Sequence, residues 1–165
     1  MKRIYMVRHA KSSWGEFGLP DFDRPLNERG KKDAPEMARR LLQKNVKIDQ
    51  FISSPAKRAR NTCKAFCEVF NYAEENILFI DELYHAPAAT FRQVIKNISD
   101  VYESVAIFSH NPGITDFVNS LVENVSIDNM PTCAVFAVSS EAGSWADFFT
   151  AERSFLLVDY PKLGL

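Results

Sequence analysis

The chain has 165 residues, of which 46% are hydrophobic and 25% charged, the balance typical of a globular domain. Twenty Lys and Arg residues oppose twenty-one Asp and Glu residues, so the net charge of -1 excludes an overall positive field that would bind nucleic acid or an anionic membrane. No apolar run approaches the roughly 20 residues that span a bilayer, and an anion site, if present, must be local.

Short apolar runs alternate with stretches of helical period, which predicts an α/β layer fold built on a mostly parallel sheet. The candidate strands are rich in Ile, Val and Phe and mostly lack alternation, so most are expected to be buried on both faces. They span residues 4–7, 50–53, 77–80, 105–109, 134–138 and 155–158.

Four segments have the apolar spacing of helices. The first follows Asn27, a predicted N-cap, and reaches Leu42 with Pro35 inside it, where a lost hydrogen bond or a bend is expected. The other three apolar stripes lie within residues 59–70, 91–98 and 114–122. Each helix is expected to bury one face on the sheet.

The cysteines and the N-terminal residues indicate a reducing compartment. Three cysteines cannot all pair, and without a Cys-x-x-Cys motif they predict neither a disulfide scaffold nor a structural zinc site. Cys63 and Cys67 lie four residues apart on an apolar helical stripe, which is typical of core residues, whereas Cys133 could be partly exposed at a strand entrance. Residues 1–9 lack a signal-peptide core and a cleavage site, so the expected location is cytoplasmic.

Two strand-to-helix junctions share one design. Ser54-Pro55 follows the second predicted strand, and Asn111-Pro112 follows the fourth. Ser or Asn at the N-cap with Pro at the first helical position predicts a helix start, whose free N–H groups favour anions at the carboxyl end of a strand. Ligands of open α/β sheets bind along this edge.

Cationic groups are predicted at the same edge. Arg8 and His9 end the first strand. Arg58 stands just inside the second helix, and His110 follows the fourth strand. Taken alone, a strand-end histidine is usually structural and a basic run on a helix is usually a solvated face. Together they change the interpretation. The two arginine guanidinium groups match phosphate oxygens, one imidazole can attack phosphorus, and the second can stabilise an oxygen or move a proton. This combination indicates phosphoryl transfer without a metal.

The residues around His9 also resemble a known family. Arg8-His9-Ala10 is similar to the Arg-His-Gly signature of the histidine phosphatase superfamily, with Ala10 in place of glycine. Residues 23–30, 53–62 and 109–113 resemble the next blocks of that superfamily, in order, and the SixA-type phosphohistidine phosphatases in particular. The resemblance covers nearly the whole chain.

This resemblance implies a role for each of the four residues. His9 would be the nucleophile that forms a transient phosphohistidine, while Arg8, Arg58 and His110 would hold the phosphoryl oxygens. It also implies the phosphoglycerate mutase-like fold, a three-layer α/β/α arrangement with a mostly parallel mixed sheet of about six strands, one antiparallel to the rest. Residues 1–165 are then expected to form a single histidine phosphatase domain.

The general acid is left open by the sequence. Ester-cleaving branches of the superfamily usually carry a glutamate after the third strand, where this chain offers Asp81, Glu82 and His85. Glu82 is the candidate donor, against the simpler interpretation that the two carboxylates are solvated and His85 packs on the loop. Gly15 stands where the mutase-like pattern has an asparagine, so one phosphate contact could be missing.

The loop after the first strand offers further pocket residues. Trp14, Phe17 and Phe22 could line a pocket rim, or could equally pack the loop onto the body. Lys11 and Ser12 adjoin the nucleophile and could assist phosphate binding, although a lysine beside a motif is often simply exposed.

These features predict a metal-independent, cofactor-free phosphohydrolase that removes phosphate from phosphohistidine on a signalling or phosphotransfer protein. Imidazole leaves more readily than an alkoxide, so the missing acid matters less for this substrate. One alternative is a small-molecule phosphomonoesterase with the same nucleophile, and another is a non-catalytic phosphate-binding module. A mutase is less favoured because the chain has little room for lid insertions between the motif blocks. The expected partner is a phosphohistidine-containing protein or a small phosphorylated substrate, not nucleic acid or a membrane, and the sequence predicts no oligomeric state.

Overall fold

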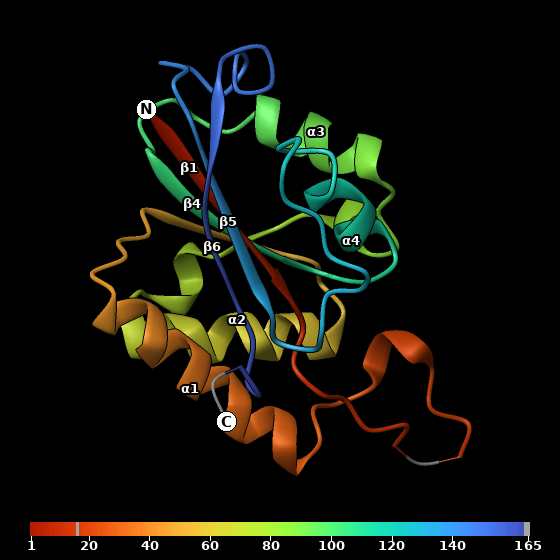
Figure 1. Cartoon of the computed structure of the whole chain (residues 1–165). Coiled ribbons are helices and arrows are strands. Elements are labelled where there is room, and N and C mark those ends of the chain that lie inside the picture. The colour runs from red at the N-terminus through yellow and green to blue at the C-terminus, as the bar shows by residue number, and fades with distance from the viewer. Residues whose placement is uncertain (16, 164–165) are drawn as a thin grey trace.

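A mixed six-stranded sheet forms the centre of the computed structural model, which describes residues 1–15 and 17–163 (Figure 1). The strands lie in the order β3-β2-β4-β1-β5-β6. They span β1 (Lys2–Arg8), β2 (Gln50–Ser53), β3 (Leu78–Phe79), β4 (Ser104–Ser109), β5 (Val135–Ser140) and β6 (Arg153–Asp159). The β1–β4, β4–β2 and β2–β3 pairs are parallel, whereas β5 is antiparallel to both β1 and β6. One strand therefore opposes the rest, as the family resemblance implied.

Helices cover both faces of this sheet. On one face lie α1 (Glu28–Gln43) and α2 (Lys57–Phe70), and on the other lie α3 (Ala88–Lys96) and α4 (Gly113–Val118) (Figure 1). Successive side chains of a strand point to opposite faces, so Val7 packs with the α1 and α2 side and Met6 with the α3 and α4 side. Both faces of the central strands are apolar for this reason, and the three-layer α/β/α prediction is confirmed.

The strands at the two edges of the sheet differ from the central ones. β3 has two residues, and both Leu78 and Phe79 are exposed, although residues 77–80 were predicted as a strand. β6 is only partly buried, whereas β2, β4 and β5 are buried along their whole length. Burial on both faces therefore holds for the strands that have a partner on each side.

Helix α1 begins as the sequence predicts. The Asn27 side chain accepts a hydrogen bond from the Gly30 N–H at 2.8 Å, which satisfies one free donor of the first turn. Pro35 lies inside the helix, which continues through it to Gln43. Helix α4 is shorter than its apolar stripe, since it ends at Val118 although apolar residues continue to Val122.

The predicted N-caps of α2 and α4 are wrong. Helix α2 begins after Ala56 and helix α4 after Pro112, and neither start has a side-chain cap. The Ser54 hydroxyl contacts His110 instead, and the Asn111 side chain accepts from the Thr115 hydroxyl and donates to Asn129. Both polar side chains therefore join tertiary contacts that compete with helix capping.

The cysteine predictions have mixed outcomes. Cys63 and Cys67 are buried on α2 beneath the sheet, as expected. Cys133 is also fully buried, which corrects the idea that it could be exposed, and burial raises the pKa of its thiol. It packs with Val135 and Met37, so it behaves as a small core side chain.

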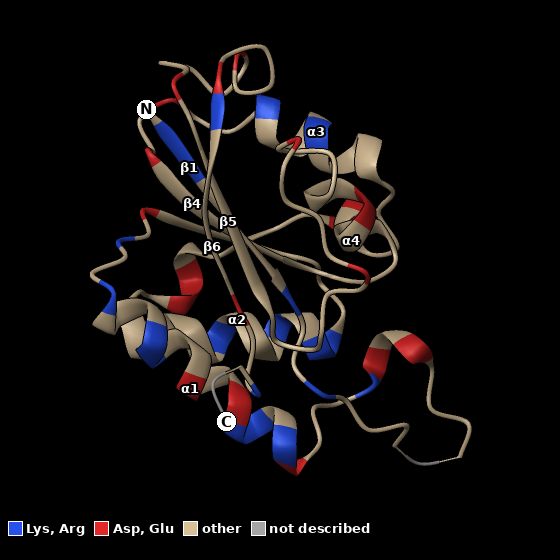
Figure 2. Ribbon diagram, in the orientation of Figure 1, with Lys and Arg blue, Asp and Glu red and all other residues tan. Residues whose placement is uncertain are grey.

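Charged residues lie on the helices, the loops and the ends of strands, while the middle of the sheet is nearly free of them (Figure 2). Lys and Arg alternate with Asp and Glu along α1. None of the helices in the described ranges is both long and apolar enough to cross a membrane.

Candidate active site

A cavity of about 630 Å³ lies where β1 and β4 end and α2 begins. Arg8 is the last residue of β1, and His9 follows it. His110 follows β4, which runs parallel to β1 with Arg8 opposite Ser109. Arg58 enters from the first turn of α2. The structure therefore brings the four residues predicted from the sequence into one cavity, because parallel neighbouring strands end at the same edge.

The His9 imidazole is buried and held in one tautomer. Its Nδ1 lies 2.8 Å from the Ala10 carbonyl oxygen, which can only accept, so Nδ1 carries the proton and Nε2 keeps a free electron pair. Burial, together with the positive charges of Arg58 and Arg8, lowers the pKa of His9 to about 3. At neutral pH the ring is therefore uncharged and has the form required of a nucleophile.

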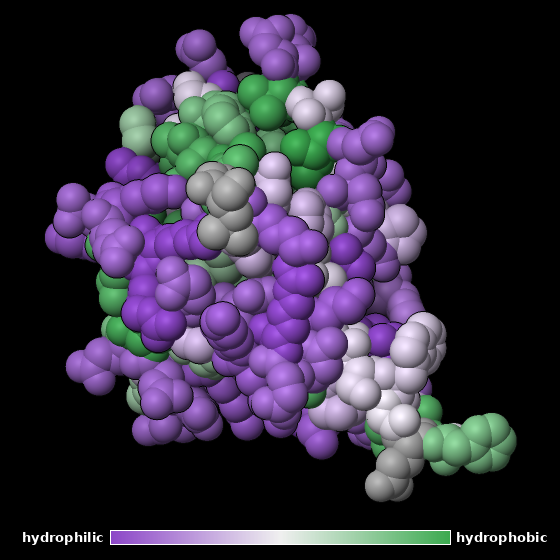
Figure 3. Space-filling view, turned by 60° about the horizontal axis from the view of Figure 1, so that its bottom comes forward, coloured by the Kyte–Doolittle hydropathy of each residue, from purple (hydrophilic) through white to green (hydrophobic). Residues whose placement is uncertain are grey.

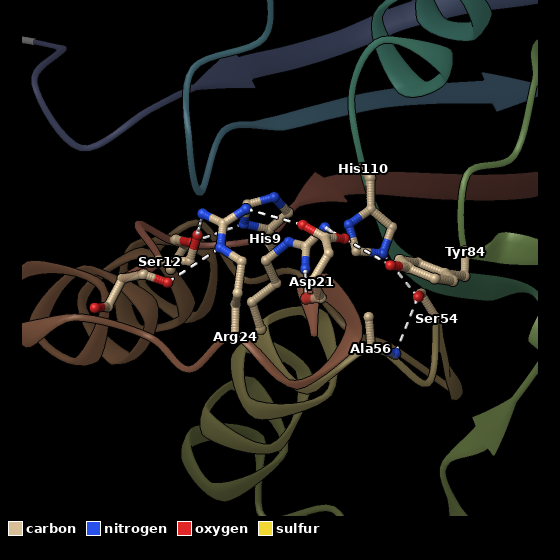
Figure 4. A network of polar contacts seen from close by, with 11 residues as sticks. His9, Ser12, Asp21, Arg24, Ser54, Ala56, Tyr84 and His110 are labelled. Carbon is tan, nitrogen blue, oxygen red and sulfur yellow. Dashed lines mark hydrogen bonds and ion pairs between the residues drawn. The ribbon is translucent and has the colours of Figure 1, made fainter. Parts of the chain in front are cut away.

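His110 faces His9, with 5.3 Å between the ring centroids. Its Nε2 lies 2.7 Å from the Ser54 hydroxyl, which also accepts from the Ala56 N–H at 3.3 Å (Figure 4). Burial, with the positive charge of Arg58 nearby, lowers the pKa of His110 to about 2, so this ring is uncharged as well. Its Nδ1 is buried and has no hydrogen-bond partner among the residues that the structure describes.

Two buried uncharged histidines make stability depend on pH. The unfolded chain binds protons at these rings near pH 6.5, whereas the folded chain does not, so the free energy of unfolding must fall as the pH drops from 7 to 4. The expected loss is on the order of 3 kcal/mol for His110. Urea titrations at several pH values should show a smaller loss for His110→Gln, and an unchanged slope would contradict the assignment.

The two predicted arginines each keep a buried donor without a partner. Arg8 donates from Nη1 to the Met130 carbonyl at 2.8 Å, and Arg58 donates from Nη1 and Nη2 to the Asp21 carbonyl and carboxylate at 2.7 and 3.0 Å. Within the described part of the chain, neither Nε has a partner. A buried donor costs free energy unless an acceptor satisfies it, so these atoms, with Nδ1 of His110, suit an anion with several oxygens.

Close backbone contacts hold the segments around the histidines. A Cβ at Gly113 would lie 1.7 Å from the Ala86 carbonyl oxygen, so glycine lets the start of α4 meet the segment that carries His85. His85 reaches the cavity from this segment with a φ of 62°, and its ring centroid lies 6.4 Å from that of His110. The fold thus places a third histidine at the cavity.

Comparisons with known proteins agree with this geometry. Residues 4–84 match the sequence family described as the histidine phosphatase superfamily (branch 1). The structure superposes on a protein from Agrobacterium tumefaciens that is assigned as the phosphohistidine phosphatase SixA, with a TM-score of 0.82, 26% identity, and coverage of 97% of this chain and 98% of that one. This chain belongs to the histidine phosphatase superfamily. It is a phosphatase, so the alternative of a non-catalytic phosphate-binding module is not retained.

Two relatives of this histidine phosphatase extend the comparison. An uncharacterized chloroplast protein of Arabidopsis thaliana is 30% identical over 156 residues, which cover 90% of this chain and 71% of that protein. Phosphoserine phosphatase 1 of Hydrogenobacter thermophilus is 36% identical over 86 residues, which cover 49% of this chain and 40% of that enzyme. The likeness to the second relative is therefore confined to about half of this phosphatase.

Arg24 and Asp21 also line the cavity, and the sequence analysis gave neither a role. The Arg24 guanidinium donates to the Ser12 hydroxyl at 2.7 Å and to the Asp21 carboxylate at 3.1 Å (Figure 4). Asp21 lies in the 3-10 turn η1 (Asp21–Asp23). This turn is too short to show an apolar periodicity, so the sequence pattern could not place Asp21 at the cavity. The available signal was the block of residues 23–30, which contains Arg24.

Asp21 is ionised at neutral pH. Burial alone would raise the pKa of its carboxyl, but hydrogen bonds from the Tyr84 hydroxyl at 2.6 Å and from Arg24 and Arg58 hold that pKa well below its usual range. An ionised carboxylate accepts hydrogen bonds and donates none. Asp21 therefore orients the two arginines and cannot serve as a proton donor in this state.

The choice of Glu82 as general acid is wrong for this structure. Glu82 lies in the 3-10 turn η3 (Asp81–Leu83), is exposed, and borders an apolar groove with Leu78 and Val94 instead of the phosphatase cavity. Leu83 is fully buried, and anchoring this side chain in the core turns the two preceding carboxylates toward solvent. Of the three donors considered after the third strand, the structure brings His85 to the described cavity.

Proposed function

We propose that this phosphatase hydrolyses phosphohistidine on a protein, with His9 as the nucleophile. Two observations together carry the proposal. His9 is uncharged with its Nε2 free, and Asp21, the carboxyl group that lines the cavity, is ionised and has no proton to give. A phosphohistidine whose second ring nitrogen is protonated leaves as neutral imidazole and needs no proton from the enzyme. An alkoxide leaving group needs one, and general acid catalysis is typically worth about 10²–10⁴-fold.

The reaction takes two steps at phosphorus. In the first, the Nε2 electron pair of His9 forms the new P–N bond while the bond to the substrate imidazole breaks and its electron pair leaves with that ring. Because Nδ1 of His9 keeps its proton on the Ala10 carbonyl, the phosphorylated ring is cationic and is itself a good leaving group. In the second step, water attacks phosphorus, the P–N bond to His9 breaks, and inorganic phosphate is released.

Arginine and histidine donors balance the charge of the transferred group. Arg8 and Arg58 contribute their unpartnered Nε atoms, and His110 contributes Nδ1, to the phosphoryl oxygens. Arg24 adds a third positive charge at the cavity wall. Resemblance to the Agrobacterium protein, which is assigned as a phosphohistidine phosphatase, supports the same substrate class.

The test compares kcat/KM for a histidine-phosphorylated phosphotransfer domain with kcat/KM for phosphoserine, sugar phosphates and nucleotides, all in EDTA. We expect the phosphoprotein to be preferred by at least about 100-fold, the size of a lost general-acid contribution. Equal or better turnover of an ester would contradict the proposal.

A phosphomonoesterase with the same nucleophile is the second candidate. It is favoured by the similarity to phosphoserine phosphatase 1 over 86 residues and by His85, which lines the cavity and could protonate an alkoxide. Under this function, His85→Ala would impair ester hydrolysis strongly. Under phosphohistidine hydrolysis, the same variant would lose little activity.

Ser54 sets the tautomer of His110 in this mechanism. The Ser54 hydroxyl accepts the Ala56 N–H at 3.3 Å and lies 2.7 Å from His110 Nε2, to which it can donate its one hydrogen. The proton of His110 then resides on Nδ1, which is the nitrogen that must donate to the phosphoryl group. Ser54→Ala removes this constraint, and we expect kcat to fall about tenfold.

Ser140→Ala is the matched control for this prediction. Ser140 is buried, accepts the Ala142 N–H at 3.2 Å and donates to the Phe148 carbonyl at 2.8 Å, so it has the same local geometry far from the cavity. Nitrogen-15 NMR of the imidazoles should show a shift of His110 toward the Nε2-protonated tautomer in Ser54→Ala alone. An unchanged spectrum and an unchanged kcat would refute the role of Ser54.

A further inference from the structure

The chain after β1 extends from the body beside the cavity before it returns at η1 (Figure 1). Its base is fixed by backbone contacts, a bridge between Ser12 and Leu26 and a hydrogen bond from the Ser13 N–H to the Pro25 carbonyl at 2.8 Å. Arg24 adds side-chain contacts to the same base. The described residues of this segment are therefore presented on a firm support.

Two aromatic side chains of this segment face solvent. Trp14 is 78% exposed, and the Arg24 guanidinium lies 4.0 Å from its ring centroid, so it stands at the cavity wall. Phe17 is fully exposed. Figure 3 shows apolar atoms at the tip of a projection from an otherwise mostly hydrophilic lower surface. Exposed aromatic side chains beside a functional cavity are typical of protein contact sites, where such residues carry much of the binding free energy.

Phe22 behaves differently from these two. Its ring packs edge-on against Tyr84, with centroids 5.2 Å apart, and thereby ties η1 to the body of the protein. From the sequence, each of the three aromatic residues could either line the rim or pack the loop onto the body. The structure separates one that anchors the segment from two that remain available for a ligand.

We propose that Trp14 and Phe17 form a docking surface for the folded protein that carries the phosphohistidine. This inference rests on the proposed function. A histidine side chain is short, so its phosphoryl group reaches His9 only if the backbone of the carrier lies at the mouth of the cavity. A carrier in that position lies against the cavity wall at Trp14, and it buries both rings if it extends along the same segment to Phe17 and offers an apolar surface there.

The size of these side chains suits a transient complex. An aromatic residue buries about 150–250 Å² when it is covered, whereas weak, short-lived complexes bury less than about 1,200 Å² in total. Two rings therefore supply a substantial part of such an interface. A free phosphohistidine is a single amino acid, and Phe17 does not line the cavity of about 630 Å³ that would receive it, so it has no need of Phe17.

The test separates docking from chemistry with two substrates. Phe17→Ala is the informative variant because Phe17 is fully exposed, whereas Trp14 stacks on a cavity arginine. With a histidine-phosphorylated phosphotransfer domain, we expect KM to rise about tenfold or more, as for a central interface residue, with kcat nearly unchanged. With free phosphohistidine, Phe17→Ala should equal the wild type. Val101→Ala, which removes an exposed apolar side chain outside the cavity, is the control.

The outcomes distinguish this inference from the proposed function. If the wild type hydrolyses both substrates and Phe17→Ala matches it on both, docking through this surface is refuted while phosphohistidine hydrolysis stands. A parallel loss on both substrates also refutes docking, because it places the effect in the cavity. If the wild type turns over neither substrate, the proposed function fails, and the docking surface fails with it.

Discussion

His9→Ala is expected to abolish turnover, with kcat lowered by about 10⁴-fold or more, since the nucleophile of a covalent mechanism cannot be replaced by the remaining side chains. The fold should survive because alanine leaves the Ala10 carbonyl and the surrounding strand pairing in place, and the His9 ring makes one hydrogen bond within the described part of the chain. Rapid-quench assays with a radiolabelled phosphohistidine substrate should trap an acid-labile phosphoenzyme in the wild type and none in the variant.

His85→Ala provides the histidine control. His85 lines the same cavity but is exposed, and its removal should leave most phosphohistidine hydrolysis intact. Thermal unfolding of both variants should give a Tm close to that of the wild type. Near-wild-type activity in a correctly folded His9→Ala protein would contradict the proposed mechanism.

Arg58→Ala should cause the second largest loss, about 10²–10³-fold in kcat/KM, because the proposed mechanism loses one of its donors to the phosphoryl oxygens. It also removes one of the two arginines that pair with the Asp21 carboxylate, contacted by Arg58 at 3.0 Å, so that Arg24 alone balances this negative charge beside the incoming phosphate. Binding of inorganic phosphate, measured as a competitive inhibition constant, should weaken together with the rate.

Two further variants test the geometry of Arg58. Arg58→Lys keeps the charge but loses the fork that contacts Asp21 twice, so it should recover little activity. Lys57→Ala removes a positive charge from the same turn of α2, outside the described cavity lining, and should act like the wild type. An equal loss in Lys57→Ala and Arg58→Ala would show that general charge, and not this contact, determines the rate.

Much of the fold could be read from the sequence because burial leaves a periodic pattern. All six strands and four helices lie close to their predicted positions, since each presents an apolar stripe or run to the layer beside it. Arg8, His9 and His110 were placed together for a topological reason, as parallel strands end at one edge. Their catalytic roles are still predictions that the variants above would test.

The errors lie where tertiary contacts compete with local preference. Ser54 and Asn111 have ideal N-cap chemistry, yet Ser54 contacts His110, Asn111 donates to Asn129, and the helices begin later. Glu82 was chosen from its distance to the third strand, but burial of Leu83 determines which way its turn faces. No pattern in one sequence reports either choice.

The sequence by itself determined the layer architecture and the set of residues that suits phosphoryl transfer, because periodic burial and strand-end positions follow from residue types alone. Tertiary structure decided the protonation states, since burial and distant neighbours lower the pKa of both cavity histidines and hold Asp21 ionised. It also decided which loop residues reach the cavity. The cavity is also lined by Asp21, Arg24 and Trp14. Contacts between segments without apolar periodicity hold these residues there, and such contacts exist only once the chain has folded.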